Sequence, residues 1–482
     1  MMGREIGFPP LILLCVAGLL ACHSGEAGSA IPPEQKLSPR LRGSWSADSQ
    51  SAAVRQRVLI DLATQVDLAQ LADSLRRSGA DRHTRRRIVL ERLRQTAERS
   101  QARVKPLLER LQQRGEIDGY RSVVIVNRLI ANATPVAIRA LAEQREVVAI
   151  TEETVAWPSV LSAGPAASAA IDSTSWALDA VGAPAAWRQG LDGRGVVVGL
   201  IDAGASATHE QLRQNYRGGE RSWHNPVDPT PSPLDILVGH GTGVLSAAVG
   251  GGAGGRKIGV APGAQWIACV GLPGGRYSNV ALTECADWML TIGQPDVLIN
   301  PWQLPNAGCD RSLERIVAAW RAAEILPVLA AGNHGPTEGT DRSPANYALS
   351  VGAIQRQGTL LPRSSRGPNS CDGSIYPSLV APGAGVPVAF PLTASSYIRT
   401  DGTSVAAGLV AGVAALLLQH DAEATVKQLE DALRTGAADL GPPGPDNGYG
   451  YGRVSVPAAL TALDRSGAHV QANSSSVSPA HR

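Results

Sequence analysis

Between about residues 176 and 463, short apolar runs alternate with longer segments whose apolar positions recur every three or four residues. The short runs predict strands buried on both faces, and the longer segments predict helices. This alternation indicates an α/β fold with a doubly wound, mostly parallel sheet flanked by helices. The expected strands are 196–201, 264–271, 297–299 and 326–331, and the expected helices are 244–249, 280–290, 312–323, 409–418 and 426–435.

A different pattern over residues 54–155 predicts a small α+β unit with a helical insertion. Apolar runs at 57–62, 122–127 and 147–150 indicate strands, while 66–75 and 134–144 indicate helices. Between them, a single apolar stripe predicts one long helix. The stripe consists of Val89, Leu93, Ala97, Val104, Leu108 and Leu111.

The helical insertion is strongly basic, since residues 76–114 contain 13 Lys or Arg against 4 Asp or Glu. A charge density of this kind can bind nucleic acid or a membrane surface. The simpler interpretation, which we favour, is a solvated helix face, and no nucleic-acid partner is then expected. The whole chain, at a net charge of +2, gives no reason to expect an acidic partner.

Three polar residues stand beside the predicted core elements in positions suited to catalysis. Ser404 lies near the first turn of the most apolar helix, where backbone N–H groups would stabilise an oxyanion, although Ser is also a common helix cap. Asp202 ends the strand 196–201, at the edge where open α/β sheets place ligands. His240, flanked by glycines, stands at another helix start. The chain order Asp, His, Ser is one in which a Ser–His–Asp triad occurs.

Ordered motifs around these residues resemble those of the subtilase family of serine peptidases (peptidase family S8), and within it the bacillopeptidase F group. The resemblance runs from about residue 176 to about 463 and continues weakly upstream. It implies a subtilisin-like catalytic domain over 176–463 and an inhibitory propeptide over 54–155. The main motifs are 195–204, 239–242, 330–333 and 402–407, with shorter matches at 258–264, 343–346, 364–368 and 380–383.

The resemblance also implies a role for each site residue. Ser404 would attack the scissile carbonyl, His240 would take its proton and Asp202 would hold the imidazole. Asn333 and the Ser404 backbone N–H would form the oxyanion hole. The substrate would bind between two segments, of which one is Pro301, Trp302 and Gln303 and the other is Ala330, Ala331 and Gly332. The implied activity is that of an endopeptidase, made as a self-inhibited zymogen, with protein or peptide substrates.

Four positions depart from the family pattern. Ala203 replaces a hydroxyl residue beside the catalytic Asp, Gly243 replaces a second His, Gln303 replaces a Gly, and Gly408 replaces a Pro after the serine motif. None of these residues is itself a reacting group, and we therefore favour an active peptidase. The alternative is a weak or inactive homologue that acts as a cell-envelope binding protein. The sequence predicts no side-chain preference for the substrate.

The terminal segments and the linkers have compositions that predict export and flexibility. Residues 1–22 form a targeting segment whose end resembles a bacterial lipobox, with Cys22 as the lipidated residue. The alternative is an ordinary signal peptide cut near Ala30. Residues 23–53 suggest a flexible linker, 156–175 a processing linker, and 464–482 a disordered tail. A lipid on Cys22 would be the only membrane contact.

The cysteines of the predicted catalytic domain fit an exported protein. Cys269, Cys285, Cys309 and Cys371 allow three pairings, among which the sequence does not choose, and one or two disulfides are expected. Their spacing does not favour a metal site. The resemblance implies no required cofactor. Subtilases often bind structural calcium, but no loop here offers a convincing set of acidic ligands.

Overall fold

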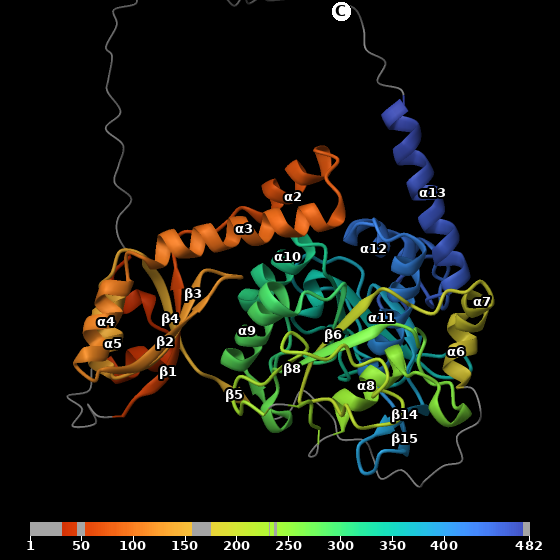
Figure 1. Cartoon of the computed structure of the whole chain (residues 1–482), viewed down its shortest axis with the longest axis horizontal. Coiled ribbons are helices and arrows are strands. Elements are labelled where there is room, and N and C mark those ends of the chain that lie inside the picture. Colours follow the sequence, from red (N-terminus) through yellow and green to blue (C-terminus); the bar gives the residue numbers. More distant parts are fainter. Residues whose placement is uncertain (1–30, 46–53, 157–174, 231, 236–238, 476–482) are drawn as a thin grey trace, which may run out of the picture.

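The computed structural model describes residues 31–45, 54–156, 175–230, 232–235 and 239–475 (Figure 1). Residues 31–156 form an N-terminal domain and residues 175–475 a larger C-terminal domain, which lie side by side. A helical arm of the N-terminal domain extends across the C-terminal domain above α10 (Glu314–Ala322). The arm is made of α2 (Leu68–Arg77) and α3 (Arg82–Gln101) (Figure 1).

The C-terminal domain is built on a seven-stranded sheet in the order β13-β12-β11-β10-β6-β8-β7, in which every described pair of neighbours is parallel. This confirms the doubly wound α/β fold. The strands are β6 (Val197–Asp202), β7 (Trp223–His224), β8 (Gln265–Val270), β10 (Val297–Asn300), β11 (Leu326–Ala330), β12 (Leu349–Ile354) and β13 (Leu379–Pro382).

Successive residues of the central strands face opposite helical layers. Val297 and Ile299 pack with α8 and α11, while Leu298 packs with α9 and α10. The helices are α6 (Trp176–Val181), α7 (Ala183–Arg188), α8 (His240–Val249), α9 (Asn279–Trp288), η4 (Met289–Gly293), α10 (Glu314–Ala322), α11 (Thr403–His420), α12 (Val426–Thr435) and α13 (Val456–Ser475). Short 3-10 turns are η2 (Ala253–Gly255), η3 (Pro273–Gly275), η5 (Arg311–Leu313) and η6 (Ala345–Tyr347).

Among the described helices, only α11 is long and apolar enough to cross a membrane. It is the central core helix, with 83% of its apolar window buried. Two further pieces, which the sequence analysis did not predict, lie outside the large sheet. They are the hairpin β14 (Val386–Phe390) and β15 (Ser396–Thr400), and the short strand β9 (Tyr277–Ser278).

The N-terminal domain carries an antiparallel sheet in the order β2-β3-β1-β4. The strand expected at 122–127 is wrong for most of its length, because β2 ends at Val123 and residues 124–127 form the turn into β3. The elements are β1 (Gln56–Leu62), α2 (Leu68–Arg77), α3 (Arg82–Gln101), α4 (Lys105–Gln113), β2 (Ile117–Val123), β3 (Arg128–Ala133), α5 (Pro135–Ala142), β4 (Val147–Glu152) and β5 (Val155–Ala156).

The single long helix expected from the apolar stripe is also wrong, because residues 102–104 separate α3 from α4. The two halves of the stripe pack in different hydrophobic cores. Val89 and Leu93 of α3 pack in the cluster that also contains α9 and α10 of the C-terminal domain. Leu108 and Leu111 of α4 pack in the core of the N-terminal domain. The helical insertion therefore spans two domains.

Two segments expected to lack structure are partly ordered. In the predicted linker 23–53, η1 (Pro33–Lys36) and α1 (Pro39–Trp45) pack on the N-terminal domain, where Leu37 and Leu41 are buried. In the predicted tail 464–482, α13 continues to Ser475. The targeting segment with Cys22 and the processing linker, apart from residues 156 and 175, lie outside the described residues.

Candidate active site

Asp202 and His240 meet at the carboxyl edge of the large sheet. Asp202 is the last residue of β6 and His240 the first residue of α8. The His240 Nδ1 lies 2.8 Å from the Asp202 Oδ2, and the Asp202 side chain is fully buried. The helix can approach so closely because residue 241 is glycine: a Cβ there would collide with the Gly204 carbonyl oxygen. The glycine after the histidine therefore permits the close approach of the two backbones.

A second buried carboxylate supports the histidine. Asp235 accepts hydrogen bonds from the Gly239 N–H at 2.8 Å and from the Thr242 N–H and hydroxyl at 3.0 and 2.7 Å. It thereby binds the first turn of α8. Burial lowers the pKa of His240, but the Asp202 carboxylate, through charge and hydrogen bond, and the charge of Asp235 outweigh it. The pKa of His240 is therefore raised above its ordinary 6.5.

Ser404 is the second residue of α11, whose N-cap is Gly402. It is therefore not the helix cap, which removes the simple structural explanation for a serine at this position. Its hydroxyl donates to the Pro301 carbonyl at 3.1 Å and not to His240 in this structure. Ser404 and His240 nevertheless line the same pocket, together with Asn333. Rotation of the Ser404 side chain is the step that would bring its oxygen to the imidazole.

Asn333 follows β11 and faces the start of α11. Its Oδ1 accepts a hydrogen bond from the Thr403 N–H at 3.0 Å. Because an N–H must meet the amide oxygen, this contact fixes the orientation of the amide and leaves Nδ2 as its donor group. The Thr403 hydroxyl also accepts from the Gly332 N–H at 3.1 Å. Two hydrogen bonds therefore join the start of α11 to the segment that follows β11.

The side chain of Gln303, in the first segment expected to bind substrate, reaches the second segment at Gly332. Trp302 is buried among apolar residues, with 3% of its surface exposed, and so offers a ligand only its backbone. The Gln303 amide contacts the His334 ring and lies directly over Gly332, since a Cβ on Gly332 would collide with its oxygen. Ala330 and Ala331 are buried in the core. Gln303 therefore fills space between the two segments.

Two of the departures from the family pattern have a packing reason. A Cβ on Gly408 would lie 2.6 Å from the Val244 carbonyl oxygen, so glycine lets α11 cross close to α8. A Cβ on Gly243 would lie 3.1 Å from a methyl group of Val388 in β14, which occupies the space of a larger side chain. At the third departure, the Ala203 backbone N–H donates to the Asp202 Oδ1 at 2.6 Å.

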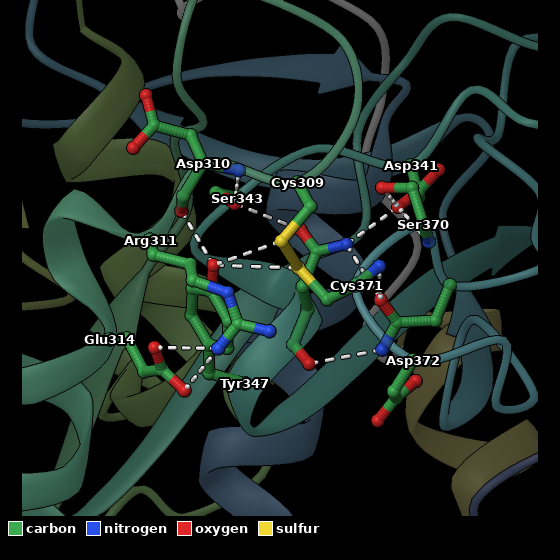
Figure 2. Close-up of a disulfide and its surroundings, with 12 residues drawn as sticks. Cys309, Asp310, Arg311, Glu314, Asp341, Ser343, Tyr347, Ser370, Cys371 and Asp372 are labelled. Carbon is green, nitrogen blue, oxygen red and sulfur yellow. Dashed lines mark hydrogen bonds and ion pairs between the residues drawn. A yellow bond between two sulfur atoms is a disulfide. The ribbon is translucent and has the colours of Figure 1, made fainter.

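The described residues contain two disulfides, which confirms the expectation of one or two for the four cysteines of this domain. Cys269–Cys285 joins β8 to α9, and Cys309–Cys371 joins two surface loops. Figure 2 shows the second bridge, with the Tyr347 hydroxyl beside both sulfur atoms. Its loops continue from the segment 301–303 and from Ser365, whose N–H donates to the Gly332 carbonyl at 2.9 Å. The bridge therefore ties together the supports of both candidate substrate segments.

In the part of the chain that the structure describes, no group of three or more His, Cys, Asp or Glu residues could hold a metal ion. The candidate site consists of side chains and backbone alone: a carboxylate–imidazole pair, a hydroxyl at a helix N-terminus, and an amide donor. These are the groups that acyl transfer through a serine nucleophile requires.

Comparison with known proteins defines the class. The subtilase family model matches residues 193–452, which is more than half of the chain. The chain therefore belongs to the subtilase family of serine peptidases, as the motifs predicted.

Particular relatives place the chain within the family. It is 31% identical to bacillopeptidase F of Bacillus subtilis over 91% of its own length and 33% of that protein. It thus spans about a third of that relative. It is also 33% identical to subtilisin Savinase of Lederbergia lenta, over 60% of this chain and 98% of that protein. The minor extracellular protease Epr of Bacillus subtilis is 29% identical over 59% of this chain.

The structure brings together Asp202 and His240, and it places Ser404 and Asn333 around the same pocket. Sequence reasoning missed Asp235, which lies five residues before the histidine in a stretch without apolar periodicity. It also missed the contact between Gln303 and His334, which are 31 residues apart. The departure of Gln303 from the family pattern was the one signal of that contact.

Proposed function

We propose that this protein is a serine endopeptidase that uses Asp202, His240 and Ser404 as its triad. The 2.8 Å contact between Asp202 and His240, at the edge where Ser404 and Asn333 also lie, carries the proposal. The Asp202 carboxylate keeps the proton on Nδ1, which leaves Nε2 as the base.

In the first step the Ser404 Oγ bonds to the scissile carbonyl carbon while its proton passes to the His240 Nε2. The carbonyl oxygen gains negative charge and accepts from the Asn333 Nδ2 and the Ser404 N–H, at the positive end of α11. His240 then gives its proton to the leaving amine as the peptide C–N bond breaks. Water, activated by the same imidazole, resolves the acyl-enzyme.

We also propose that the N-terminal domain is an inhibitory propeptide. Its last described strand, β5, pairs antiparallel with β9 of the C-terminal domain. Asn279 extends this contact, since its side-chain oxygen accepts from the Thr154 N–H at 2.9 Å. Backbone pairing of an extended segment with an unpaired strand is a common way to bind a peptide. The proposal is a zymogen that is cut within residues 157–174.

Export follows as part of the same proposal. Two disulfides within one domain are typical of an oxidising compartment, and one relative is named an extracellular protease. Lipidation of Cys22 is the anchoring route that we propose, with protein or peptide segments as substrates.

A fluorophosphonate probe tests the proposal directly, since it labels only an activated serine. Wild type that has lost its N-terminal domain should be labelled, whereas Ser404→Ala should not. Asn333→Ala is expected to be labelled more slowly. Absence of labelling in folded, matured wild type would instead favour the cell-envelope binding protein.

A further inference from the structure

The arm formed by α2 and α3 contacts the C-terminal domain far from β5. Three arginines on α3 are almost fully buried there: Arg82 is 3% exposed, and Arg85 and Arg86 are 8% exposed. The solvated helix face expected from the sequence is therefore wrong for these three residues. Burial of a charged guanidinium is costly unless its donors are satisfied, so their partners define what the arm recognises.

Arg86 binds a group of backbone carbonyl oxygens. Its Nε donates to Ala323 at 3.1 Å, and its two Nη atoms donate to Gln294 at 3.2 Å, Pro295 at 3.0 Å and Glu324 at 3.2 Å. One Nη also lies 3.3 Å from the Asp296 carboxylate. One guanidinium thus uses donors on all three nitrogens.

Arg82 and Arg85 complete the contact. Arg82 donates to the carbonyl oxygens of Glu324 at 2.6 Å and Asp296 at 3.3 Å. The Nε of Arg85 lies 2.9 Å from the Glu324 carboxylate. Leu75, Val89 and Leu93 pack in the same apolar cluster as α10, so the polar contacts lie beside an apolar one.

These carbonyls lie just beyond the C-terminal ends of two helices. Residues 294–296 follow η4 and lead into β10, while residues 323–324 follow α10 and lead towards β11. Both helix ends turn through a residue with positive φ, Gln294 at 51° and Glu324 at 57°. Gln294 and Ala323 are the C-cap residues of η4 and α10, and carbonyls at a helix C-terminus lack intrahelical partners and carry partial negative charge. A guanidinium, with five fixed donors, matches them well.

The same positions lie at the amino edge of the sheet, opposite to the catalytic residues. β10 and β11 are neighbouring parallel strands, so the helices that precede them end side by side. Asp202 and Asn333 lie at the carboxyl ends of their strands. The arm is therefore separate both from the tail strand β5 and from the contact at α9, where Glu284 pairs with Arg57 and Arg121 of the N-terminal sheet.

We propose that the α2–α3 arm is an additional anchor, which holds the N-terminal domain in place after the connection to the C-terminal domain is cut. The inference rests on the proposed zymogen function and adds its release step: cleavage within 157–174 does not by itself free the enzyme. Linked contacts dissociate far more slowly together than any one alone, because each keeps the others at high effective concentration.

The test uses the full chain with Ser404→Ala, so that it does not depend on catalysis. A recognition site for a specific protease is placed within residues 157–174 and cut, and the chain is immobilised through its C-terminus. Release of the N-terminal fragment is then followed during buffer flow. Arg82→Ala with Arg86→Ala should speed release by about 30-fold or more, as expected when buried charge partners are removed.

The matched control replaces two arginines on the exposed face of the same helix, Arg87 and Arg99, by alanine. The rate at which this variant releases the N-terminal fragment should stay within about threefold of the rate of the parent chain. Equal release from the control and from the buried pair would overturn the proposal. If the alanine pair does not fold, as judged by thermal unfolding before the cut, Arg82→Lys with Arg86→Lys decides. Faster release supports the anchor, and an unchanged rate overturns it.

The outcome is separable from that of the proposed function. A matured chain that fails to react with the fluorophosphonate probe would refute the peptidase while leaving the anchor intact. A chain that reacts, but whose fragment is lost equally from all variants, would refute the anchor alone.

Discussion

Gln303 fills the space between two backbone segments proposed to bind substrate, and its replacement by glycine tests that assignment. The side chain is buried, lies over Gly332 and contacts His334. Gly332 has a φ of 110° and cannot readily accept a side chain of its own. The wild-type enzyme should therefore prefer Gly or Ala before the scissile bond.

The Gln303→Gly substitution removes two methylenes and an amide from this space. A Leu or Phe side chain that enters it would leave water and gain about 1.5–3 kcal/mol. This corresponds to an increase of roughly 10- to 150-fold in kcat/KM for substrates with such a residue. Substrates with Ala at this position should change little, because a methyl group already fits.

The assay compares kcat/KM for a series of chromogenic peptides that differ only in the residue before the scissile bond. His334→Ala is the companion variant. It removes one partner of the Gln303 amide and should give a smaller gain, because the side chain is then held less firmly. Wild type that cleaves after Phe or Leu as well as after Ala would refute the reasoning. So would a Gln303→Gly enzyme with an unchanged order of preference.

Four further predictions follow from the site and its supports. Asn333→Ala should lower kcat by about 10²–10³-fold with little change in KM, a cost known for subtilisin of the same family and not worked out from this structure; steady-state kinetics check it. His240 must be neutral to act as the base, and its pKa is raised. The kcat/KM should therefore fall as the pH drops through a value above 6.5. A pH–rate profile whose acidic midpoint lies at or below pH 6.5 would contradict this. Replacing Cys309 and Cys371 by alanine opens a loop with a sequence separation of 62 and should lower the free energy of unfolding by up to about 4 kcal/mol, measured by denaturant titration. Burial raises the pKa of Asp287 to about 6 where it accepts two backbone N–H groups of the N-terminal domain. Affinity for that domain should therefore fall as the pH rises from about 4 through 6, and Asp287→Asn should flatten this change; fragment release rates that fall with rising pH would contradict it.

The residues of the candidate triad could be located from the sequence because local pattern places each of them. An apolar strand delivers Asp202, a glycine-flanked helix start delivers His240, and another helix start delivers Ser404. The doubly wound sheet was predictable for a similar reason, since its strands are buried on both faces and its helices are amphipathic or apolar throughout. In these elements, local preference and tertiary environment agree.

The failures occurred where tertiary contacts override local pattern. The apolar run 122–127 has strong strand propensity, yet Val124 and Ile125 form a turn whose N–H groups bind the Asp287 carboxylate of α9. Arg82 and Arg86 belong to a basic segment that is ordinarily solvated, and only the fold reveals that two helices end beside them. Composition along one segment carries no information about such distant partners.

The arm contact and the proposed catalysis both follow from the polarity of one parallel sheet. Helices that run antiparallel to its strands begin at the carboxyl edge, so α8 and α11 present N–H groups and partial positive charge where Ser404 would generate an oxyanion. The same helical layers end at the amino edge, where η4 and α10 present carbonyl groups and partial negative charge to the arginines of α3. The proposed oxyanion site and the arginine contact of the arm therefore lie at opposite edges of the sheet. The N-terminal domain can hold one edge by charge while its tail strand pairs with β9, and neither contact competes with the other.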